Sequence, residues 1–346
     1  MDKKVIRLGM IGAGSFSREH LEGIRGLKNA EIVAIADSIE ERAKEKAETF
    51  AIPSYYKDYK ELLAREDIDA VTLPLPDQVH CQIAVDALRA GKHVLCEKPM
   101  ALDLDECKTM IAAAKETGKQ LMVGQIGRYT PAFVRAKQLV EEGVIGDLVF
   151  IESEYAHDYS KIGGTGGWRV TPERHPILGG GCHAIDLIRM IAGNPTEVTA
   201  YATNKVLLDW PINDTTIGIM KFENGVIGKV FNSHGCKRQY TMRTAIYGTT
   251  GTLIFDNTTP YISVFKEELN GKDSFLGEDQ QVVEMKLPIK LNNHNCAGEI
   301  EDFCNCILNN RPVTTDGVEG ASTVSVGLAI VKSVETGLPV KVDYNF

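Results

Sequence analysis

Short apolar runs alternate with amphipathic segments over the first third of the chain. The apolar runs, each bounded by Gly, Pro or polar residues, lie at residues 5–11, 31–36, 70–74, 92–96 and 120–124. Segments with apolar positions at helical spacing lie between and after them, at residues 17–27, 40–50, 58–64, 79–90, 104–117 and 131–142. Strands and helices that alternate in this way are typical of a doubly wound parallel sheet. The pattern predicts an α/β Rossmann domain over residues 1–125.

The pattern changes near residue 147, where apolar and polar positions begin to alternate with period two. Such strand-like runs lie at residues 148–155, 198–203, 215–222, 226–233, 241–247 and 251–256. Asn224 and Gly225 separate two of them and form a strong hairpin signal. Helical segments follow at residues 299–308 and 320–336, and a last strand at 338–342. We expect a second α/β domain over residues 126–346 with a large, mostly antiparallel sheet.

Composition narrows the class of protein. A chain of 346 residues with 43% hydrophobic and 25% charged residues suggests a globular protein of two domains. No segment reaches the roughly 18 apolar residues of a membrane span, and residues 1–4 lack a signal-peptide pattern, so we expect a cytoplasmic protein without membrane contact. The net charge of −9 argues against a nucleic-acid partner. The eight cysteines show no zinc spacing, which favours reduced structural thiols and no metal site.

The first strand leads directly into a glycine-rich turn, residues 12–17, that opens a helix. Gly12 permits the tight turn and Gly14 lets backbone amides approach a pyrophosphate, so that Gly12, Gly14, Ser15 and Phe16 are expected to bind a dinucleotide. Ser17 stands where a third Gly or Ala is usual.

Asp37 follows the second strand, slightly beyond the distance of roughly 20 residues at which an acidic side chain binds the adenosine ribose. A carboxylate there accepts hydrogen bonds from the ribose hydroxyls and repels a 2'-phosphate, and no Arg is adjacent. The sequence therefore predicts NAD rather than NADP. The alternative is an Asp that only caps the helix at 40–50.

The run at residues 92–96 stops at Glu97, Lys98 and Pro99, and reads as a buried strand with Lys98 at its carboxyl end. Ligands bind at that end in open α/β sheets, so Glu97 and Lys98 are expected among the cofactor-binding residues. An ammonium that loses hydration in a cleft can exchange a proton near neutral pH. Pro99 ends the strand and could hold the preceding peptide in the cis form. In isolation, a surface lysine is the simpler interpretation. Pro76 and His80 follow the strand at 70–74, where the nicotinamide ribose is expected, although His80 could merely cap or pack at its helix start.

Residues 155–186 combine many glycines with rings and hydrogen-bonding groups. Tyr155 and His157 precede a glycine-rich stretch at 163–167, Trp168 and Arg169 follow it, and His175 precedes a second stretch at 179–181. Glycine at this density suggests a loop that lies against a ligand, and aromatic faces beside polar groups suit a polyhydroxylated one. His183 begins a helix with Asp186 one turn on, close enough to orient the imidazole or cap the turn.

Together these residues resemble the Gfo/Idh/MocA oxidoreductases, the glucose-fructose oxidoreductase and inositol dehydrogenase group. The resemblance covers almost the whole chain and is carried by the features just described and by the following further segments: residues 90–99, residues 124–131 with Arg128, residues 143–147, and the His-x-x-Asp segment at 179–186. It implies that the C-terminal sheet mediates a homo-oligomer, a dimer or tetramer, and that the C-terminal helix packs back on the first domain. It also implies an NAD-dependent dehydrogenase of sugars or cyclitols with Lys98 in its active site.

The resemblance assigns His183 as the base that removes a hydroxyl proton and Lys98 as the group that polarises the oxygen. Family members often carry an Asp four residues before this His, but Gly179 stands there. Either the two residues act without it, or another residue such as His175 substitutes. The expected substrate-binding residues are Arg128, Tyr155, His157, Trp168, Arg169, His175 and Asp186.

The variant around residues 175–183 is similar to members that oxidise a ring hydroxyl, at C3, of a glucose-type sugar or glycoside. Cyclitol oxidation, as by an inositol dehydrogenase, is the nearest rival. A glycosidase that uses NAD without net redox change, and a non-catalytic sensor of sugar or NADH, remain open alternatives.

Overall fold

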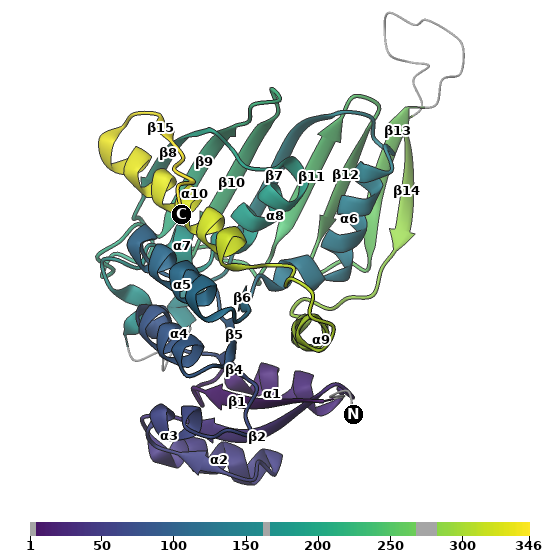
Figure 1. Cartoon of the computed structure of the whole chain (residues 1–346). Helices are drawn as coiled ribbons and strands as arrows, with labels where there is room; N and C mark the ends of the chain where they lie inside the picture. Colours follow the sequence, from purple (N-terminus) through teal and green to yellow (C-terminus); the bar gives the residue numbers. More distant parts are fainter. Residues whose placement is uncertain (1–4, 162–166, 268–281) are drawn as a thin grey trace, which may run out of the picture. The chain divides into compact units, whose positions relative to one another are not determined.

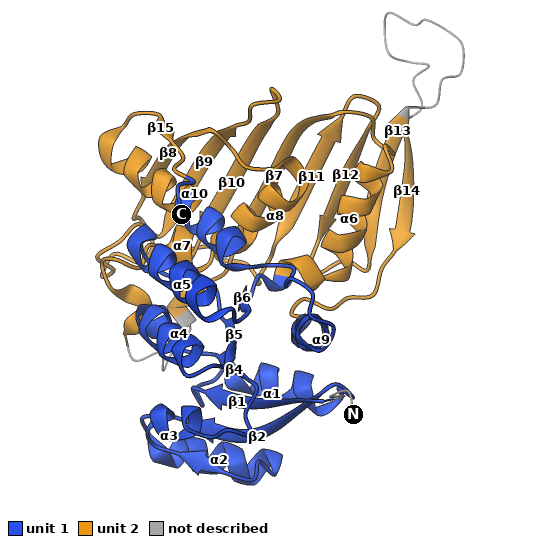
Figure 2. Cartoon of the chain, in the orientation of Figure 1, with its two compact units in different colours: residues 1–126, 295–325, 344–346 blue, residues 127–294, 326–343 orange. Residues whose placement is uncertain are grey.

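The computed structural model describes residues 5–161, 167–267 and 282–346. The chain forms two compact units (Figure 2). Unit 1 contains residues 1–126, 295–325 and 344–346, and unit 2 contains residues 127–294 and 326–343. A segment that comes late in the sequence, residues 295–325, thus belongs to the same unit as the first strands.

Unit 1 is built on six parallel strands in the order β3-β2-β1-β4-β5-β6. They are β1 (Ile6–Ile11), β2 (Ala30–Ala36), β3 (Tyr55–Tyr56), β4 (Ala70–Leu73), β5 (His93–Cys96) and β6 (Leu121–Val123). This order confirms the predicted doubly wound sheet. The order reverses between β1 and β4, and ligands of such sheets bind outside the carboxyl ends of the strands at that point.

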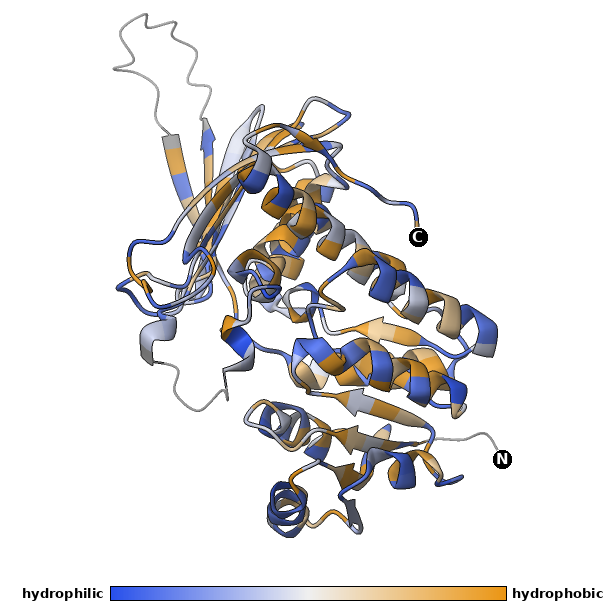
Figure 3. Cartoon of the chain, turned by 90° about the vertical axis from the view of Figure 1, so that its left-hand side faces the viewer, coloured by the Kyte–Doolittle hydropathy of each residue, from blue (hydrophilic) through white to orange (hydrophobic). Residues whose placement is uncertain are grey.

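Helices follow the strands of unit 1. They are α1 (Ser17–Arg25), α2 (Glu40–Phe50), α3 (Tyr59–Leu63), α4 (His80–Arg89), α5 (Leu104–Thr117) and α9 (Cys296–Leu308), with the start of α10 (Gly317–Thr336). The strands are mostly hydrophobic, whereas the helices carry both hydrophobic and hydrophilic positions (Figure 3). This is the distribution expected when helices bury one face against a sheet.

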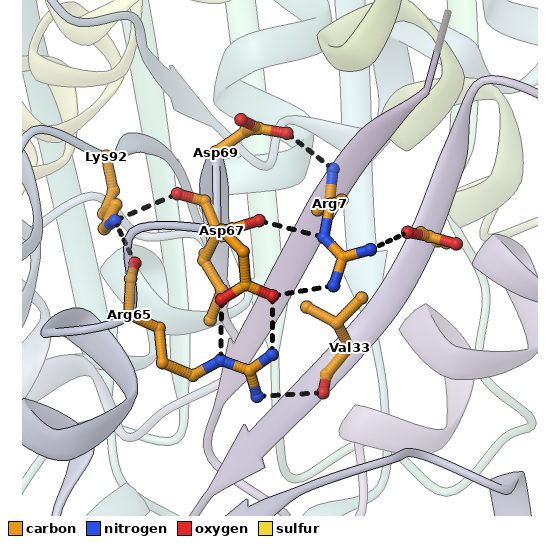
Figure 4. Close-up of polar contacts among 8 residues, drawn as sticks. Arg7, Val33, Arg65, Asp67, Asp69 and Lys92 are labelled. Carbon is orange, nitrogen blue, oxygen red and sulfur yellow. Dashed lines mark hydrogen bonds and ion pairs between the residues drawn. The ribbon is translucent and has the colours of Figure 1, made fainter.

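A network of charges ties the amino-terminal ends of these strands together (Figure 4). Asp67 accepts hydrogen bonds from the Arg65 guanidinium at 2.9 and 2.7 Å and from the Arg7 guanidinium at 2.7 Å. Those bonds hold the pKa of the Asp67 carboxyl well below its usual value. The buried Lys92 ammonium donates to the backbone carbonyls of Arg65 and Ile68. This edge of the sheet is therefore occupied by structural contacts, which leaves the carboxyl edge for ligands.

Unit 2 is built on nine strands in the order β14-β13-β12-β11-β7-β10-β9-β8-β15. They are β7 (Leu148–Ala156), β8 (Glu197–Thr203), β9 (Thr215–Lys221), β10 (Ile227–Ser233), β11 (Arg243–Gly248), β12 (Gly251–Asp256), β13 (Tyr261–Glu267), β14 (Val282–Pro288) and β15 (Val340–Lys341). Within this sheet, β7 and β10 are the only two strands that pair in parallel among the described residues, and the other ladders are antiparallel. The expected large, mostly antiparallel sheet is confirmed.

Helices α6 (Pro131–Glu141) and α8 (Cys182–Ala192) lie on one face of this sheet (Figure 1). Helix α8 packs on β7 and β10, and α6 packs on β12 and β13. A short helix, α7 (Pro176–Gly179), leads into α8, and the end of α10 covers Gly218 of β9 through Ile330. In the described part of the chain, no helix combines the length and hydropathy needed to cross a membrane.

Candidate functional site

The glycine-rich turn after β1 is shaped by close backbone contacts. Gly12 has a φ of +106°, and a Cβ there would lie 2.7 Å from the Pro74 carbonyl oxygen, so only glycine fits. A Cβ on Gly14 would meet nothing within 4 Å, which leaves the backbone open to a ligand. The buried Ser17 hydroxyl donates to the Gly14 carbonyl at 2.6 Å, at the first residue of α1. Ser17 thus packs where a third small residue is usual.

Asp37 immediately follows β2 and lies against this turn. Its Oδ2 accepts a hydrogen bond from the Ala13 N–H at 2.7 Å, and its Oδ1 accepts one from the Ile39 N–H at 2.8 Å. Each carboxylate oxygen can accept a further bond, as ribose hydroxyls would require. The open Gly14 backbone and the adjoining carboxylate therefore fit a dinucleotide with a free 2'-hydroxyl.

The other predicted cofactor residues of this region differ in exposure. Ser15 is exposed at the start of the helix, and the Phe16 ring packs edge-on against His20 at 5.4 Å. Pro76 lies half-buried before a single 3-10 turn. The fully buried His80 ring lies between two backbone carbonyl oxygens, with Nδ1 at 2.9 Å from that of Pro99 and Nε2 at 3.1 Å from that of Leu75. These contacts give His80 a role in joining the loops after β4 and β5.

Lys98 lies just beyond the carboxyl end of β5, and its peptide bond to Pro99 is cis. The preceding Glu97 is 6% exposed and pairs with His20 Nε2 at 2.8 Å, while its Oε2 accepts from the Lys98 N–H at 3.2 Å. His20 Nδ1 in turn lies 2.7 Å from the Thr72 hydroxyl. Burial alone would raise the pKa of Glu97, but His20 and Lys98 together bring it below its usual value. Glu97 is therefore a buried anion beside the Lys98 ammonium.

In unit 2 a group of rings gathers near the carboxyl ends of β7 and β10, and we call it the ring cluster. Its members are Tyr155, His157, Tyr159, His183, Trp210, His234, Tyr240 and His294. The Tyr155 ring stacks on His183 at 5.7 Å and an interplanar angle of 15°. The Tyr155 hydroxyl lies 3.2 Å from His157 Nδ1, and Tyr240 lies 4.8 Å from the His157 ring. The structure thus brings together Tyr155 and His157, which are expected to bind substrate, and His183, which is expected to be the base; these roles stay predictions.

The ring cluster carries neutral hydrogen-bonding groups. Burial raises the pKa of both Tyr155 and Tyr240, which keeps their phenols protonated. Burial and the nearby Arg169 guanidinium lower the pKa of His157, which favours the neutral imidazole. Two hollows adjoin these rings, one of about 540 Å³ beside Tyr159 and Trp210 and one of about 590 Å³ beside His157 and Tyr240. Such a surface suits an uncharged, polyhydroxylated molecule.

Two guanidinium groups contact the indole of Trp168. Arg169 Cζ lies 4.2 Å from the ring and Arg174 Cζ lies 4.9 Å from it. Arg174 is only 1% exposed, and a Cβ on Gly179 would overlap its guanidinium. The space of a side chain at position 179 is therefore filled by Arg174, a cation, at the position where the family often has Asp.

His175 lies apart from the ring cluster. It lines a small cavity of about 30 Å³ together with Ile177, Val331 and Glu335. Burial lowers the pKa of His175, and the Glu335 charge opposes that shift. Its expected substitution for the missing Asp stays a prediction. The glycine-rich stretch at 163–166 lies outside the described residues.

Arg128 and Asp186 contact each other. The Arg128 Nε and Nη2 donate to the Asp186 carboxylate at 3.0 and 2.7 Å, and Arg189 Nη1 lies 3.6 Å from it. Asp186 is 4% exposed. Two cations therefore fix this carboxylate, which anchors α8 one turn beyond His183. Direct substrate contacts for Arg128 and Asp186 stay a prediction.

The sequence did not point to three members of the ring cluster, Trp210, His234 and Tyr240. They lie outside the predicted strands, and their proximity to Tyr155 depends on strand pairing. Ser233 pairs with Ala156 in the parallel β10–β7 ladder, and this register brings His234 beside Tyr155. The sequence signal that could have identified such residues is an aromatic or His residue just after a predicted strand. Among the described residues, no three His, Cys, Asp or Glu side chains are arranged to hold a metal ion.

Comparisons with known proteins agree with this architecture. Residues 6–125 match the family model "Oxidoreductase family, NAD-binding Rossmann fold", and residues 133–254 match "GFO/IDH/MocA C-terminal domain". The chain is 29% identical to the uncharacterized oxidoreductase YrbE of Bacillus subtilis over 100% of this chain and 98% of that protein. It is 26% identical to myo-inositol 2-dehydrogenase of Thermotoga maritima over 98% and 99% of the two chains.

A solved structure of levoglucosan dehydrogenase in complex with NADH shares the fold, with a TM-score of 0.87 at 24% identity over 98% of this chain and 99% of that chain. The description of the first family model names NAD, and the geometry of the Gly12 turn and Asp37 fits that cofactor. The chain belongs to the GFO/IDH/MocA oxidoreductase family, and its first domain is an NAD-binding Rossmann domain.

Proposed function

We propose that this protein oxidises a secondary ring hydroxyl, at C3, of a glucose-type sugar or glycoside, with hydride transfer to NAD. The observation that carries the proposal is the ring cluster, in which burial favours the neutral forms of Tyr155, Tyr240 and His157 beside open hollows. Sugars present C–H faces that pack on aromatic rings and hydroxyls that need such partners. The named relatives include an inositol dehydrogenase and a levoglucosan dehydrogenase, which act on molecules of this chemistry.

Oxidation of an alcohol requires removal of the hydroxyl proton as hydride leaves the carbon. The bound nicotinamide supplies the hydride acceptor. His183, which is 9% exposed and stacked on Tyr155, is the proposed proton acceptor. Lys98, held beside the Glu97 carboxylate, is the proposed group that stabilises negative charge on the oxygen.

The remaining predicted substrate groups divide by their contacts. Tyr155 and His157 are proposed to bind hydroxyls directly. Trp168 and Arg169 are proposed to flank the ligand near Tyr159, because the Arg169 guanidinium lies over both the Trp168 and the Tyr159 rings. Arg174 is proposed to supply positive charge where relatives use Asp, which would favour ionisation of the hydroxyl. Oxidation of a cyclitol is the second candidate, favoured by the likeness to myo-inositol 2-dehydrogenase along almost the whole chain.

The substrate test is NADH formation, followed by absorbance, with glucose, O- and C-glucosides, levoglucosan, myo-inositol and scyllo-inositol. The product of each active compound is identified by NMR. A 3-keto sugar is the expected product. NADH formation with inositols alone would identify the protein as a cyclitol dehydrogenase. Release of an aglycone without NADH would contradict the proposed net oxidation.

The catalytic roles are tested with Lys98→Met and His183→Gln. Each should lower kcat by a factor of about 10² to 10⁴, the usual contribution of a positioned acid or base. NADH binding, measured by fluorescence, should stay within a few-fold of the unsubstituted protein for His183→Gln. A kcat near the original value in either variant removes that residue from the mechanism.

A further inference from the structure

Glu299 is a fully buried acid for which the proposed reaction has no use. It lies in the first turn of α9 and is 0% exposed. Neither of its carboxylate oxygens has a hydrogen-bond partner among the described residues. A buried carboxylate without a partner is costly in its ionised form, whereas the protonated acid is tolerated. The geometry thus favours a neutral Glu299.

Packing places Glu299 in the same buried region as Glu97 and Lys98. Helix α9 packs on α1 and on β5, and the approach to α1 is close, because a Cβ on Gly23 would lie 3.0 Å from the Ala297 N. Glu299 interacts electrostatically with both Glu97 and Lys98. The charged and titratable groups that face this region are Glu19, His20, Glu97, Lys98 and Cys296.

These two carboxyls are in different situations. Glu97 bonds to His20 and to the Lys98 N–H, which stabilises its negative charge. Burial raises the pKa of Glu299 well above its usual value, and the Glu97 charge raises it further, against the opposing Lys98 ammonium. When two carboxyls lie close together and only one of them has hydrogen-bond partners, that one ionises and the other stays protonated. The pair then carries a single negative charge.

Glu97 immediately follows β5 at the carboxyl edge of the parallel sheet, and Glu299 lies on α9, which packs on β5. A dinucleotide bound at that edge brings a positive nicotinamide when oxidised and a neutral one when reduced. Additional positive charge favours ionisation of a neutral acid nearby. The oxidised and reduced cofactors should therefore differ in their effect on Glu299.

We propose that Glu299 is a positioning residue that stays protonated in the free protein and in its NADH complex, and releases its proton to solvent when oxidised NAD binds. The step breaks one O–H bond and leaves a carboxylate that offsets the nicotinamide charge, with no redox change in the protein. The consequence is a preference for the oxidised cofactor that grows with pH. It depends on NAD binding alone and not on the identity of the substrate.

The test is isothermal titration calorimetry of NAD and of NADH at pH 7 in phosphate and in Tris, two buffers that differ in ionisation enthalpy. The difference in measured heat gives the number of protons released. We expect a substantial fraction of one proton per chain for NAD and little for NADH. Because a proton is released, the affinity for NAD relative to NADH should rise with pH, by at most tenfold per unit.

Glu299→Gln keeps the size and the neutral state, so it should fold normally but release no proton and lose the pH dependence of the affinity ratio. Glu301→Gln, an exposed position on the same helix, is the matched control and should behave as the unsubstituted protein. Proton release that persists in Glu299→Gln would assign it to His20 or another neighbour and overturn the proposal. If Glu299→Gln does not fold, infrared difference spectra of the unsubstituted protein decide, since NAD must abolish a protonated carboxyl band and NADH must not.

Discussion

Asp37 illustrates how one side chain combines a structural and a selective role. Its two oxygens accept hydrogen bonds from the Ala13 and Ile39 N–H groups and so fix the turn that is expected to bind the pyrophosphate. The same negative charge repels a 2'-phosphate. The alternative of a simple helix cap explains the bond to Ile39 but not the bond to Ala13, which lies in the glycine-rich turn after β1.

Asp37→Asn separates these roles, because Asn keeps an acceptor and removes the charge. We expect the affinity for NADP relative to NAD to rise by at least ~10-fold, equivalent to about 1.4 kcal/mol. Fluorescence titrations with NADH and NADPH measure it. Glu40→Gln, an exposed acid in the first turn of α2, serves as the control and should leave the ratio unchanged. An unchanged ratio in Asp37→Asn would place cofactor discrimination elsewhere.

At the scale of elements, the loop between β8 and β9 is held by one buried carboxylate. Asp214 is 0% exposed, and its Oδ2 accepts N–H bonds from Lys205, Val206 and Leu207 at 3.0, 2.6 and 2.9 Å. Burial alone would raise the pKa of Asp214, but the backbone donors outweigh it and bring the pKa below its usual value. This loop also lines the hollow next to Trp210, so the carboxylate supports the site indirectly.

Asp214→Asn should lower the free energy of unfolding by about 2 kcal/mol, because hydrogen bonds to a charged acceptor contribute roughly 1.5–3 kcal/mol. A lowered folded-state pKa stabilises the protein above the unfolded value of about 4 and loses this effect as pH falls through the folded pKa. Urea unfolding at several pH values should thus show a constant difference between the two proteins at neutral pH that shrinks below about pH 4.

Asp209→Asn is the control for that measurement. It alters an exposed acid of the same loop and should leave the unfolding free energy within about 0.5 kcal/mol of the original. A difference for Asp214→Asn that grows rather than shrinks in acid would contradict the assigned role of the ionised carboxylate.

For the molecule as a whole, the sheet of unit 2 presents a second face with exposed apolar side chains. Tyr201 pairs with Ile217 across β8 and β9, and Ile219 lies two residues further along the same face. Their exposed fractions are 74%, 36% and 44%, and Ile227 on β10 is 50% exposed. Contiguous exposed apolar patches mark association sites. The face suits a second copy of the chain, as the family resemblance implies.

We expect light scattering after size exclusion to give at least twice the mass of one chain. Ile219→Asp places a charge in the middle of the apolar face and should lower the oligomer mass or make it depend on concentration. Leu338→Asp changes a side chain of similar exposure, 62%, outside that face and should leave the mass unchanged. A monomer in the unsubstituted protein would refute association through this sheet.

The periodicity of the sequence predicted nearly all the elements. The helix at 104–117 matches α5 residue for residue, and the strand at 251–256 matches β12. Strands β13 and β14 were not predicted, nor was the two-residue β3. Strand β3 was missed because it is too short to show a period. Strands β13 and β14 were missed because they depend on pairing with neighbouring strands. Local patterns succeed where local backbone geometry dictates which positions are apolar.

The chemistry of the site was only partly encoded in local sequence. The turn at Gly12, the carboxylate at Asp37 and the Lys98 segment were recognisable because each lies within a strand-turn-helix unit of the chain. The sequence did not show that Arg174 fills the space beside Gly179, because this contact depends on how a loop folds back on a helix.

Sequence alone therefore determined the fold class, the cofactor and the family of this protein, since these follow from periodicity and contiguous motifs. Only the tertiary structure placed His234 beside Tyr155 and buried Glu299 near Glu97. Strand register and helix packing join residues far apart in the chain, and burial then decides their protonation. The spacing of residues along a single strand or helix does not show strand register, helix packing or the burial that follows from them.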